Sequence, residues 1–146
     1  MSPSETKRWP LDTKLFAIGL AVWALHVLGR AFLDESQLTV GRALMLFNGL
    51  KLYADEARIA LLAEAGIFSV VALGMYLQRR WALLMALALM ADIVLNHLLF
   101  VITNLSTPHE LAHVRTEAFE GPILVALTLY LWIRSKWLVF GWTDSA

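Results

Sequence analysis

One apolar segment, residues 81–102, constrains the fold of this chain more than any other stretch. It reads WALLMALALMADIVLNHLLFVI and is long enough to cross a bilayer, where a helix needs about 20 mostly apolar residues. Three polar residues interrupt it: Asp92, Asn96 and His97. A carboxylate near the middle of a membrane span costs a few kcal/mol or more unless it is paired, hydrated or neutralised. We therefore expect the rest of the fold to supply partners for this segment.

The composition of the whole chain also indicates a membrane protein. Apolar residues make up 59% of its 146 residues and charged residues 16%, whereas a soluble domain carries about 25% charged residues. The formal net charge is zero, which argues against a nucleic-acid partner. The chain has no cysteine, so disulfides, thiol redox chemistry and thiolate metal sites are excluded.

Four apolar segments predict an all-α, integral membrane four-helix bundle that forms a single domain over residues 1–146. The predicted spans are residues 14–33, 58–77, 81–102 and 123–139. A short basic turn, Gln78-Arg79-Arg80, connects the second and third spans.

The two longer connections are each predicted to contain an interfacial helix. Residues 38–53 are apolar enough to meet a membrane but are interrupted by charged and small residues, so an interfacial or re-entrant helix is favoured over an additional span. In the second connection, Thr107 is a good N-cap, Pro108 suits the first turn, and Glu110 can reach back to complete a capping box. This amphipathic helix is expected to end at Gly121-Pro122.

The distribution of lysine and arginine predicts the orientation. With four spans, the side that holds both termini and the basic turn carries seven of the 12 basic residues, and the other side carries five. Cytoplasmic loops carry the excess of Lys and Arg. We therefore expect both termini in the cytoplasm, the two long connections outside, and a location in a bacterial inner membrane.

Six polar residues of the predicted spans fall at similar depth. A helix rises about 1.5 Å per residue, which places four of them roughly 8–10 Å below the outer interface, with Asp92 one turn deeper and Arg30 one turn above. The six are His26, Arg30, Glu64, Asp92, Asn96 and His97. A purely structural interpretation is also open. His26 could be a hydrogen-bonded core histidine, Glu64 a protonated carboxyl, and Asp92 with Asn96 a polar contact between helices. Because ionisable groups inside a membrane are functional candidates by default, we interpret this polar layer as a ligand-binding site.

A second candidate site follows the third span. Residues His109-Glu110-Leu111-Ala112-His113 match the H-E-x-x-H zinc-protease pattern. On a helix, His109, His113 and Glu117 lie on one polar stripe and could bind a metal ion at the membrane surface. A capped, solvated helix explains the same residues. Protease activity is disfavoured, because the chain has little room for a substrate cleft and no obvious second motif.

Residues 61–100 carry a family resemblance. With Glu64, Gly74 and Arg79 or Arg80 in corresponding places, this block resembles the second and third spans of DoxX-like membrane proteins. The resemblance implies a small four-helix protein associated with quinone or thiosulfate redox systems.

Three hypotheses about function remain open. In the first, the polar layer binds a lipophilic or quinone-like molecule, with His26, Glu64 and His97 making polar contacts. In the second, His26 and His97 ligate one haem, or Asp92, His97, His109 and His113 hold a metal ion. In the third, the protein is an accessory subunit of a larger membrane complex, and the layer fastens helices. The sequence leaves open the cofactor, enzymatic activity and the choice between a homo-oligomer and a larger complex.

Overall fold

The computed structural model describes residues 9–32, 45–47, 50–52, 54–106 and 111–138. They form four helices, α1 (Leu11–Ala31), α2 (Ala54–Tyr76), α3 (Arg80–Asn104) and α4 (Leu111–Leu138), and two short strands, β1 (Met45–Phe47) and β2 (Leu50–Leu52). The prediction of a helical fold is confirmed. Helices α1, α2 and α3 are long and apolar enough to cross a membrane, and they overlap the first three predicted spans.

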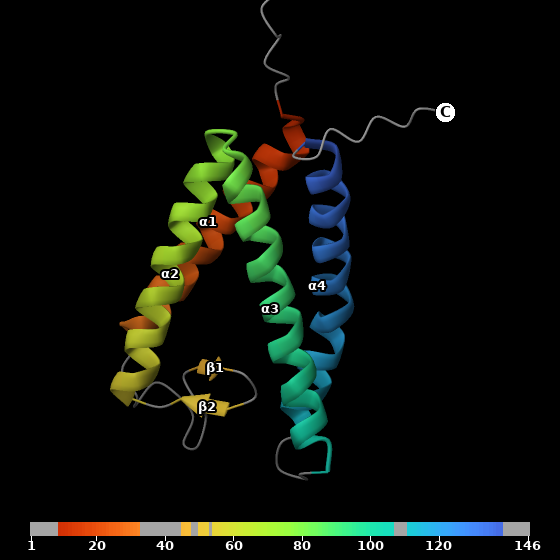
Figure 1. Cartoon of the computed structure of the whole chain (residues 1–146). Coiled ribbons are helices and arrows are strands. Elements are labelled where there is room, and N and C mark those ends of the chain that lie inside the picture. The colour runs from red at the N-terminus through yellow and green to blue at the C-terminus, as the bar shows by residue number, and fades with distance from the viewer. Residues whose placement is uncertain (1–8, 33–44, 48–49, 53, 107–110, 139–146) are drawn as a thin grey trace, which may run out of the picture.

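The four helices are arranged as two pairs (Figure 1). Helix α1 packs along α2, and α3 packs along α4. The pairs meet at what we call the turn end, which holds residues 77–79, the start of α1 and the end of α4. They separate toward the opposite end, which holds β1 and β2 and is called the hairpin end.

Two clusters of buried apolar side chains stabilise this arrangement. The larger cluster draws on all four helices, with Leu20 of α1, Phe68 of α2, Leu83 of α3 and Leu131 of α4 among its members. The smaller cluster joins only α1 and α2, through Val27, Ala31, Leu61 and Ala65. Tight packing between the two helix pairs is therefore concentrated in the larger cluster.

A compact reversal of the chain connects α2 to α3. Gln78 adopts a left-handed backbone conformation with φ 59°, as is typical of the residue that follows a helix. The N–H of Arg79 bonds to the carbonyl of Gly74 at 2.8 Å and the N–H of Gln78 to that of Met75 at 2.9 Å, which is the Schellman pattern. The Gln78 side-chain oxygen accepts a bond of 3.3 Å from the N–H of Trp9, so the turn also holds the segment that leads into α1.

Hydroxyl side chains within the helices bond to their own helix. Ser69 donates to the carbonyl of Ala65 at 2.8 Å and Thr128 to that of Leu124 at 2.7 Å. Ser135 donates to the carbonyl of Trp132 at 2.8 Å. These groups therefore satisfy their donors without a neighbouring helix.

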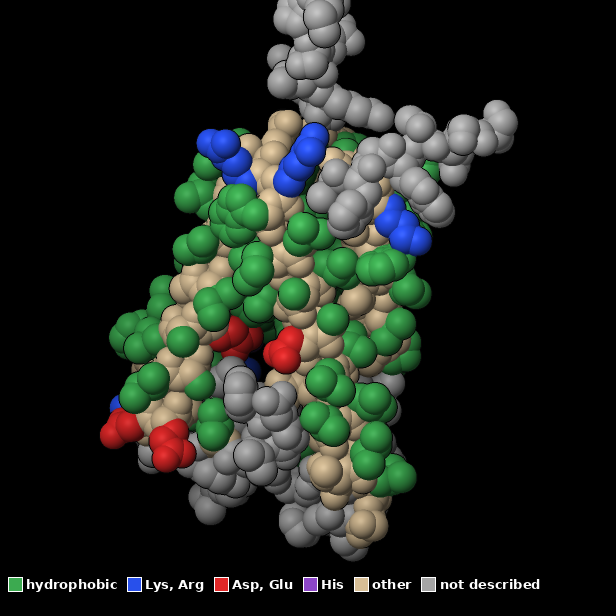
Figure 2. All heavy atoms as spheres, viewed as in Figure 1, with side chains coloured by type: hydrophobic (Ala, Val, Ile, Leu, Met, Phe, Trp, Pro, Cys, Tyr) green, Lys and Arg blue, Asp and Glu red, His purple; other side chains and the backbone are tan. Residues whose placement is uncertain are grey.

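The described surface suits a membrane. Figure 2 shows apolar side chains spread over the helices and basic side chains grouped toward the turn end. Large apolar residues such as Val22, Leu73, Leu98 and Leu129 are exposed on all four helices. Soluble monomers rarely expose continuous apolar surface of this kind.

Two predictions about the connections were wrong. Within residues 38–53, the described segments form an antiparallel hairpin, with Met45 paired to Leu52 and Phe47 to Leu50, instead of an interfacial helix or an additional span. Two short apolar segments can satisfy their backbone groups by pairing with each other, and the Asn-Gly sequence between them favours a hairpin.

The predicted interfacial helix before the fourth span is also not a separate element. Helix α4 continues from Leu111 through Gly121 and Pro122 to Leu138. Proline removes one backbone donor, but neighbouring helices and local adjustments let membrane helices accommodate it. Glu120 and Arg134 bound the apolar stretch of α4, and this helix is not among the three that meet the length and hydropathy criteria for a span in the described chain.

Candidate functional site

Glu64 lies at the junction of three helices. It is half-buried on α2, and the indole of Trp23 on α1 is within reach as a hydrogen-bond donor to its carboxyl group. Arg30 of α1 and Asp92 of α3 both act on this carboxyl electrostatically. The structure therefore brings three of the six predicted residues, Arg30, Glu64 and Asp92, into one electrostatic group.

Part of this group lies beside a hollow in the described surface. Asp92 is exposed, and Figure 2 shows acidic side chains beside a hollow between α2 and α3. Glu64 and Asp92 lie just beyond the larger apolar cluster, whose members nearest to them along α2 and α3 are Phe68 and Met90. We call Trp23, Arg30, Glu64 and Asp92 the Glu64 site.

His26 lies at the edge of the Glu64 site. Its ring is exposed and is 5.5 Å from the ring of Trp23, measured between centroids, with the planes inclined at 41°. His26 and Trp23 are three residues apart on α1, so they are neighbours on one helical face. His26 thus contacts the residue that can donate to Glu64.

His97 faces a different helix. Its Nδ1 donates to the carbonyl of Ile93 at 2.8 Å, and its Nε2 lies 3.8 Å from a carboxylate oxygen of Glu120 on α4. The side chain of His97 is 22% exposed and that of Glu120 is 53% exposed. His97 therefore joins α3 to α4, and Glu120 is a contact that sequence reasoning missed.

The geometry of α3 explains this division. Asp92 and His97 are five residues apart, so an α-helix with 3.6 residues per turn points their side chains in directions about 140° apart. Asp92 can act on α2 while His97 reaches α4. Asn96, the third polar residue of this segment, is half-buried. Asp92 and His97 lie at similar depth, but their angular positions on α3 direct Asp92 toward α2 and His97 toward α4.

The predicted metal site falls mainly outside the described part of the chain. His109 lies outside the described residues. His113 and Glu117 are on the first turns of α4, but their side chains are outside the description. Among the side chains that the structure does describe, no group of three or more His, Cys, Asp or Glu residues could hold a metal ion.

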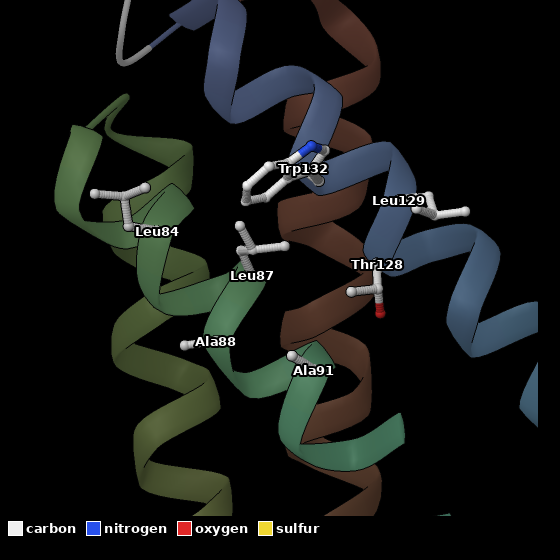
Figure 3. A pocket seen from close by; sticks show the side chains of 7 residues that line it. All are labelled: Leu84, Leu87, Ala88, Ala91, Thr128, Leu129 and Trp132. Carbon is white, nitrogen blue, oxygen red and sulfur yellow. The ribbon is translucent and has the colours of Figure 1, made fainter. Parts of the chain in front are cut away.

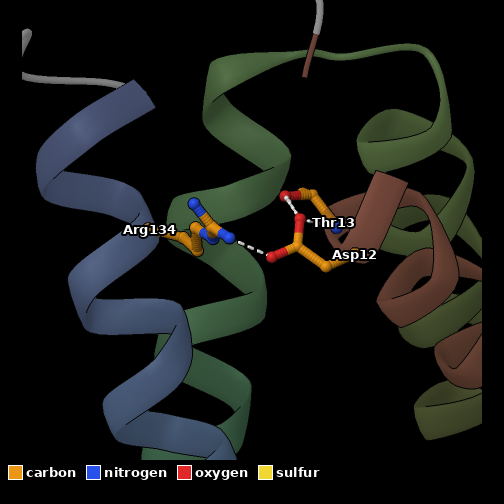
Figure 4. A network of polar contacts seen from close by, with 3 residues as sticks. All are labelled: Asp12, Thr13 and Arg134. Carbon is orange, nitrogen blue, oxygen red and sulfur yellow. Dashed lines mark hydrogen bonds and ion pairs between the residues drawn. The ribbon is translucent and has the colours of Figure 1, made fainter. Parts of the chain in front are cut away.

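A polar network at the turn end was not predicted (Figure 4). Asp12, in the first turn of α1, accepts a bond of 2.8 Å from the N–H of Thr13 and forms an ion pair with Arg134 of α4. The Arg134 guanidinium lies 5.7 Å from the centre of the Tyr130 ring, which stacks on Phe16 of α1 at 5.9 Å. This network connects the first and last helices, at residues 122 positions apart in the sequence.

Comparison with known proteins adds no assignment. No family model, no curated protein and no solved structure matches the chain. The site must therefore be interpreted from its own residues.

Proposed function

We propose that this protein spans a membrane with four helices and binds a lipophilic molecule with a hydrogen-bonding head group, such as a quinone, at the Glu64 site. The observation that carries the proposal is a half-buried carboxyl group between apolar helices, with an indole donor and a guanidinium nearby. A membrane protein seldom places such a costly group there without a functional reason.

The residues around the hollow match the chemistry of a quinone. Arg30 supplies N–H donors for a carbonyl oxygen, and Glu64 and Asp92 supply oxygens that accept from a quinol hydroxyl. The single N–H of Trp23 orients the Glu64 carboxyl. The apolar helix surfaces around them suit the ring and tail of the ligand. The quinone would supply the redox chemistry, and this chain would bind and orient it.

The proposed orientation places the turn end in the cytoplasm. The described basic residues of this end are Lys14, Arg79, Arg80, Arg134 and Lys136. Arg30 and Arg58 lie farther along the helices toward the hairpin end. Helix α4 follows α3 along its length, which supports α4 as the fourth span. The Glu64 site would then lie in the outer half of the bilayer.

Titration of the purified protein with decylubiquinol, kept reduced under anaerobic conditions, tests the proposal, with quenching of tryptophan fluorescence as the signal. Wild type should bind saturably, and Glu64→Gln should raise the Kd about tenfold or more, since a hydrogen bond to a charged group contributes roughly 1.5–3 kcal/mol. Glu56→Gln is the matched control, because Glu56 is an exposed residue in the first turn of the same helix. Equal Kd values for wild type and Glu64→Gln, or no saturable binding, would overturn the proposal.

A further inference from the structure

An open apolar groove runs between α3 and α4 near the turn end (Figure 3). Its lining includes Leu84, Leu87, Ala88 and Ala91 of α3, and Thr128 and Trp132 of α4. The Thr128 hydroxyl already donates to its own helix, so it leaves the apolar character of the groove intact. Figure 3 shows the Trp132 indole extending toward Leu87 across the two helices. The groove is suited to a hydrocarbon chain.

Basic side chains flank the turn-end mouth of this groove. Arg80 is four residues before Leu84 on α3, and Lys136 is four residues after Trp132 on α4, so each lies one turn beyond a lining residue. The Lys136 ammonium group is 5.0 Å from the centre of the Trp132 ring. Within the described part of the chain no side chain caps the N-terminus of α3, and the partial positive charge of a helix N-terminus adds to that of the two basic residues.

We propose that this groove binds one anionic phospholipid of the cytoplasmic leaflet. Its phosphate lies between Arg80 and Lys136, and one acyl chain follows the apolar floor from Leu84 to Ala91. That distance is about 10 Å at 1.5 Å per residue, which accommodates the upper part of an acyl chain. Basic pockets between membrane helices on the cytoplasmic side bind anionic head groups. The inference rests on the membrane orientation proposed above and is independent of the ligand at the Glu64 site.

Charge favours a lipid over a second copy of the chain as the occupant. Copies in one membrane share the same orientation, so a dimer formed through this groove would bring Arg80 and Lys136 of both copies to the same level. Like charges placed together in an interface oppose association. An anionic phosphate neutralises these charges instead.

Native mass spectrometry of the purified protein with equimolar dioleoyl phosphatidylglycerol and dioleoyl phosphatidylcholine tests the site. Wild type should retain one phosphatidylglycerol in preference to phosphatidylcholine. Arg80→Gln and Lys136→Gln should each reduce that preference about fivefold, which corresponds to about 1 kcal/mol per basic residue. Lys14→Gln is the matched control, because it removes one positive charge from α1 at the same end of the molecule.

Filling the groove gives an independent test. Ala91 is exposed, so Ala91→Phe should leave the fold intact while it lowers retention of the phospholipid. Decylubiquinol binding should stay unchanged in this variant, and Glu64→Gln should retain phosphatidylglycerol normally, which separates the two proposals. Equal retention of both lipids by wild type would overturn the inference. So would equal effects of Arg80→Gln and Lys14→Gln, or an Ala91→Phe variant that dissociates a dimer without changing lipid retention.

Discussion

The turn end and the hairpin end are held together in different ways. At the turn end, Asp12 and Arg134 join the first and last helices, and the adjoining apolar cluster includes side chains from all four. Toward the hairpin end, the cluster of Val27, Ala31, Leu61 and Ala65 joins only α1 and α2. Well-packed regions provide the rigid part of a structure, whereas binding regions are drawn from its less stable parts. Among the described residues, apolar packing between the two helix pairs is therefore strongest toward the turn end, and the Glu64 site lies just beyond it.

Polar groups follow the same division. Asp12 accepts from Thr13 and pairs with Arg134, so its charge is compensated within a compact network. Asp92 and His26 are exposed on helices that are apolar enough to cross a membrane. In lipid such exposure is costly, and residues that accept this cost usually contact water, a ligand or another polar group. The difference between the paired Asp12 and the exposed Asp92 and His26 therefore supports a ligand at the Glu64 site.

Accessibility to a membrane-impermeant maleimide should give an all-or-none difference between the two ends. The chain has no cysteine, so Arg80→Cys at the turn end and Ser106→Cys at the hairpin end can each be labelled without background. In spheroplasts, Ser106→Cys should react and Arg80→Cys should react only after permeabilisation. Reaction of both from one side would contradict the assignment of the two ends to opposite faces of the membrane.

A pair of glycine substitutions on α2 should show a large difference in stability. A Cβ at Gly74 would lie 2.6 Å from the Cβ of Ala82 and 2.8 Å from the Trp81 ring, whereas a Cβ at Gly66 meets nothing within 4 Å. Gly74→Ala should therefore lower the free energy of unfolding by about 1–3 kcal/mol through overpacking. Gly66→Ala should change it by no more than about 1 kcal/mol, in the stabilising direction, because alanine favours helix.

Unfolding of the two variants in the same detergent measures this difference. Tolerance of Gly74→Ala would show that the turn end is less rigid than its packing indicates. An equal loss in Gly66→Ala would mean that the helix itself, instead of the contact between α2 and α3, limits stability.

The smallest effect concerns coupling within the candidate site. Arg30 acts on Glu64 electrostatically, whereas Glu120 pairs with His97 at the other face of α3. A double-mutant cycle of Arg30→Gln and Glu64→Gln should give a coupling energy of about 0.5 kcal/mol or more. The cycle of Glu64→Gln and Glu120→Gln should be additive within about 0.3–0.5 kcal/mol. Strong coupling in the second cycle, measured by unfolding in bicelles, would mean that the polar layer acts as one network.

The helices were predictable because apolar length is a direct signal in the sequence. Helix α3 extends from Arg80 to Asn104, against a predicted span of residues 81–102. The hairpin was missed although Asn48-Gly49 lies between its strands in the sequence, and Asn-Gly between apolar residues is a strong hairpin signal. Gly121-Pro122 was given too much weight as a helix terminator, since α4 passes through it.

The candidate site was predictable only in depth. Counting residues along each span placed Glu64, Asp92 and His97 at neighbouring levels, but which helix each side chain faces depends on packing. The pairing of His97 with Glu120 and of Asp12 with Arg134 requires the rotation of each helix about its own axis. Nothing in a single sequence gives that rotation when apolar residues surround a helix on all sides.

The hydroxyl groups that bond within their own helices have a consequence for biogenesis. Ser69, Thr128 and Ser135 carry their hydrogen-bond partners with them, so, in the proposed four-span arrangement, their hydroxyl groups would not need a neighbouring helix when α2 and α4 enter the bilayer. Assembly can then follow as a second stage, by packing of helices already in place. Because Asp12 is on α1 and Arg134 is on α4, their ion pair can form only after α4 has been synthesised. Its formation would mark the moment at which the separate helices become one bundle.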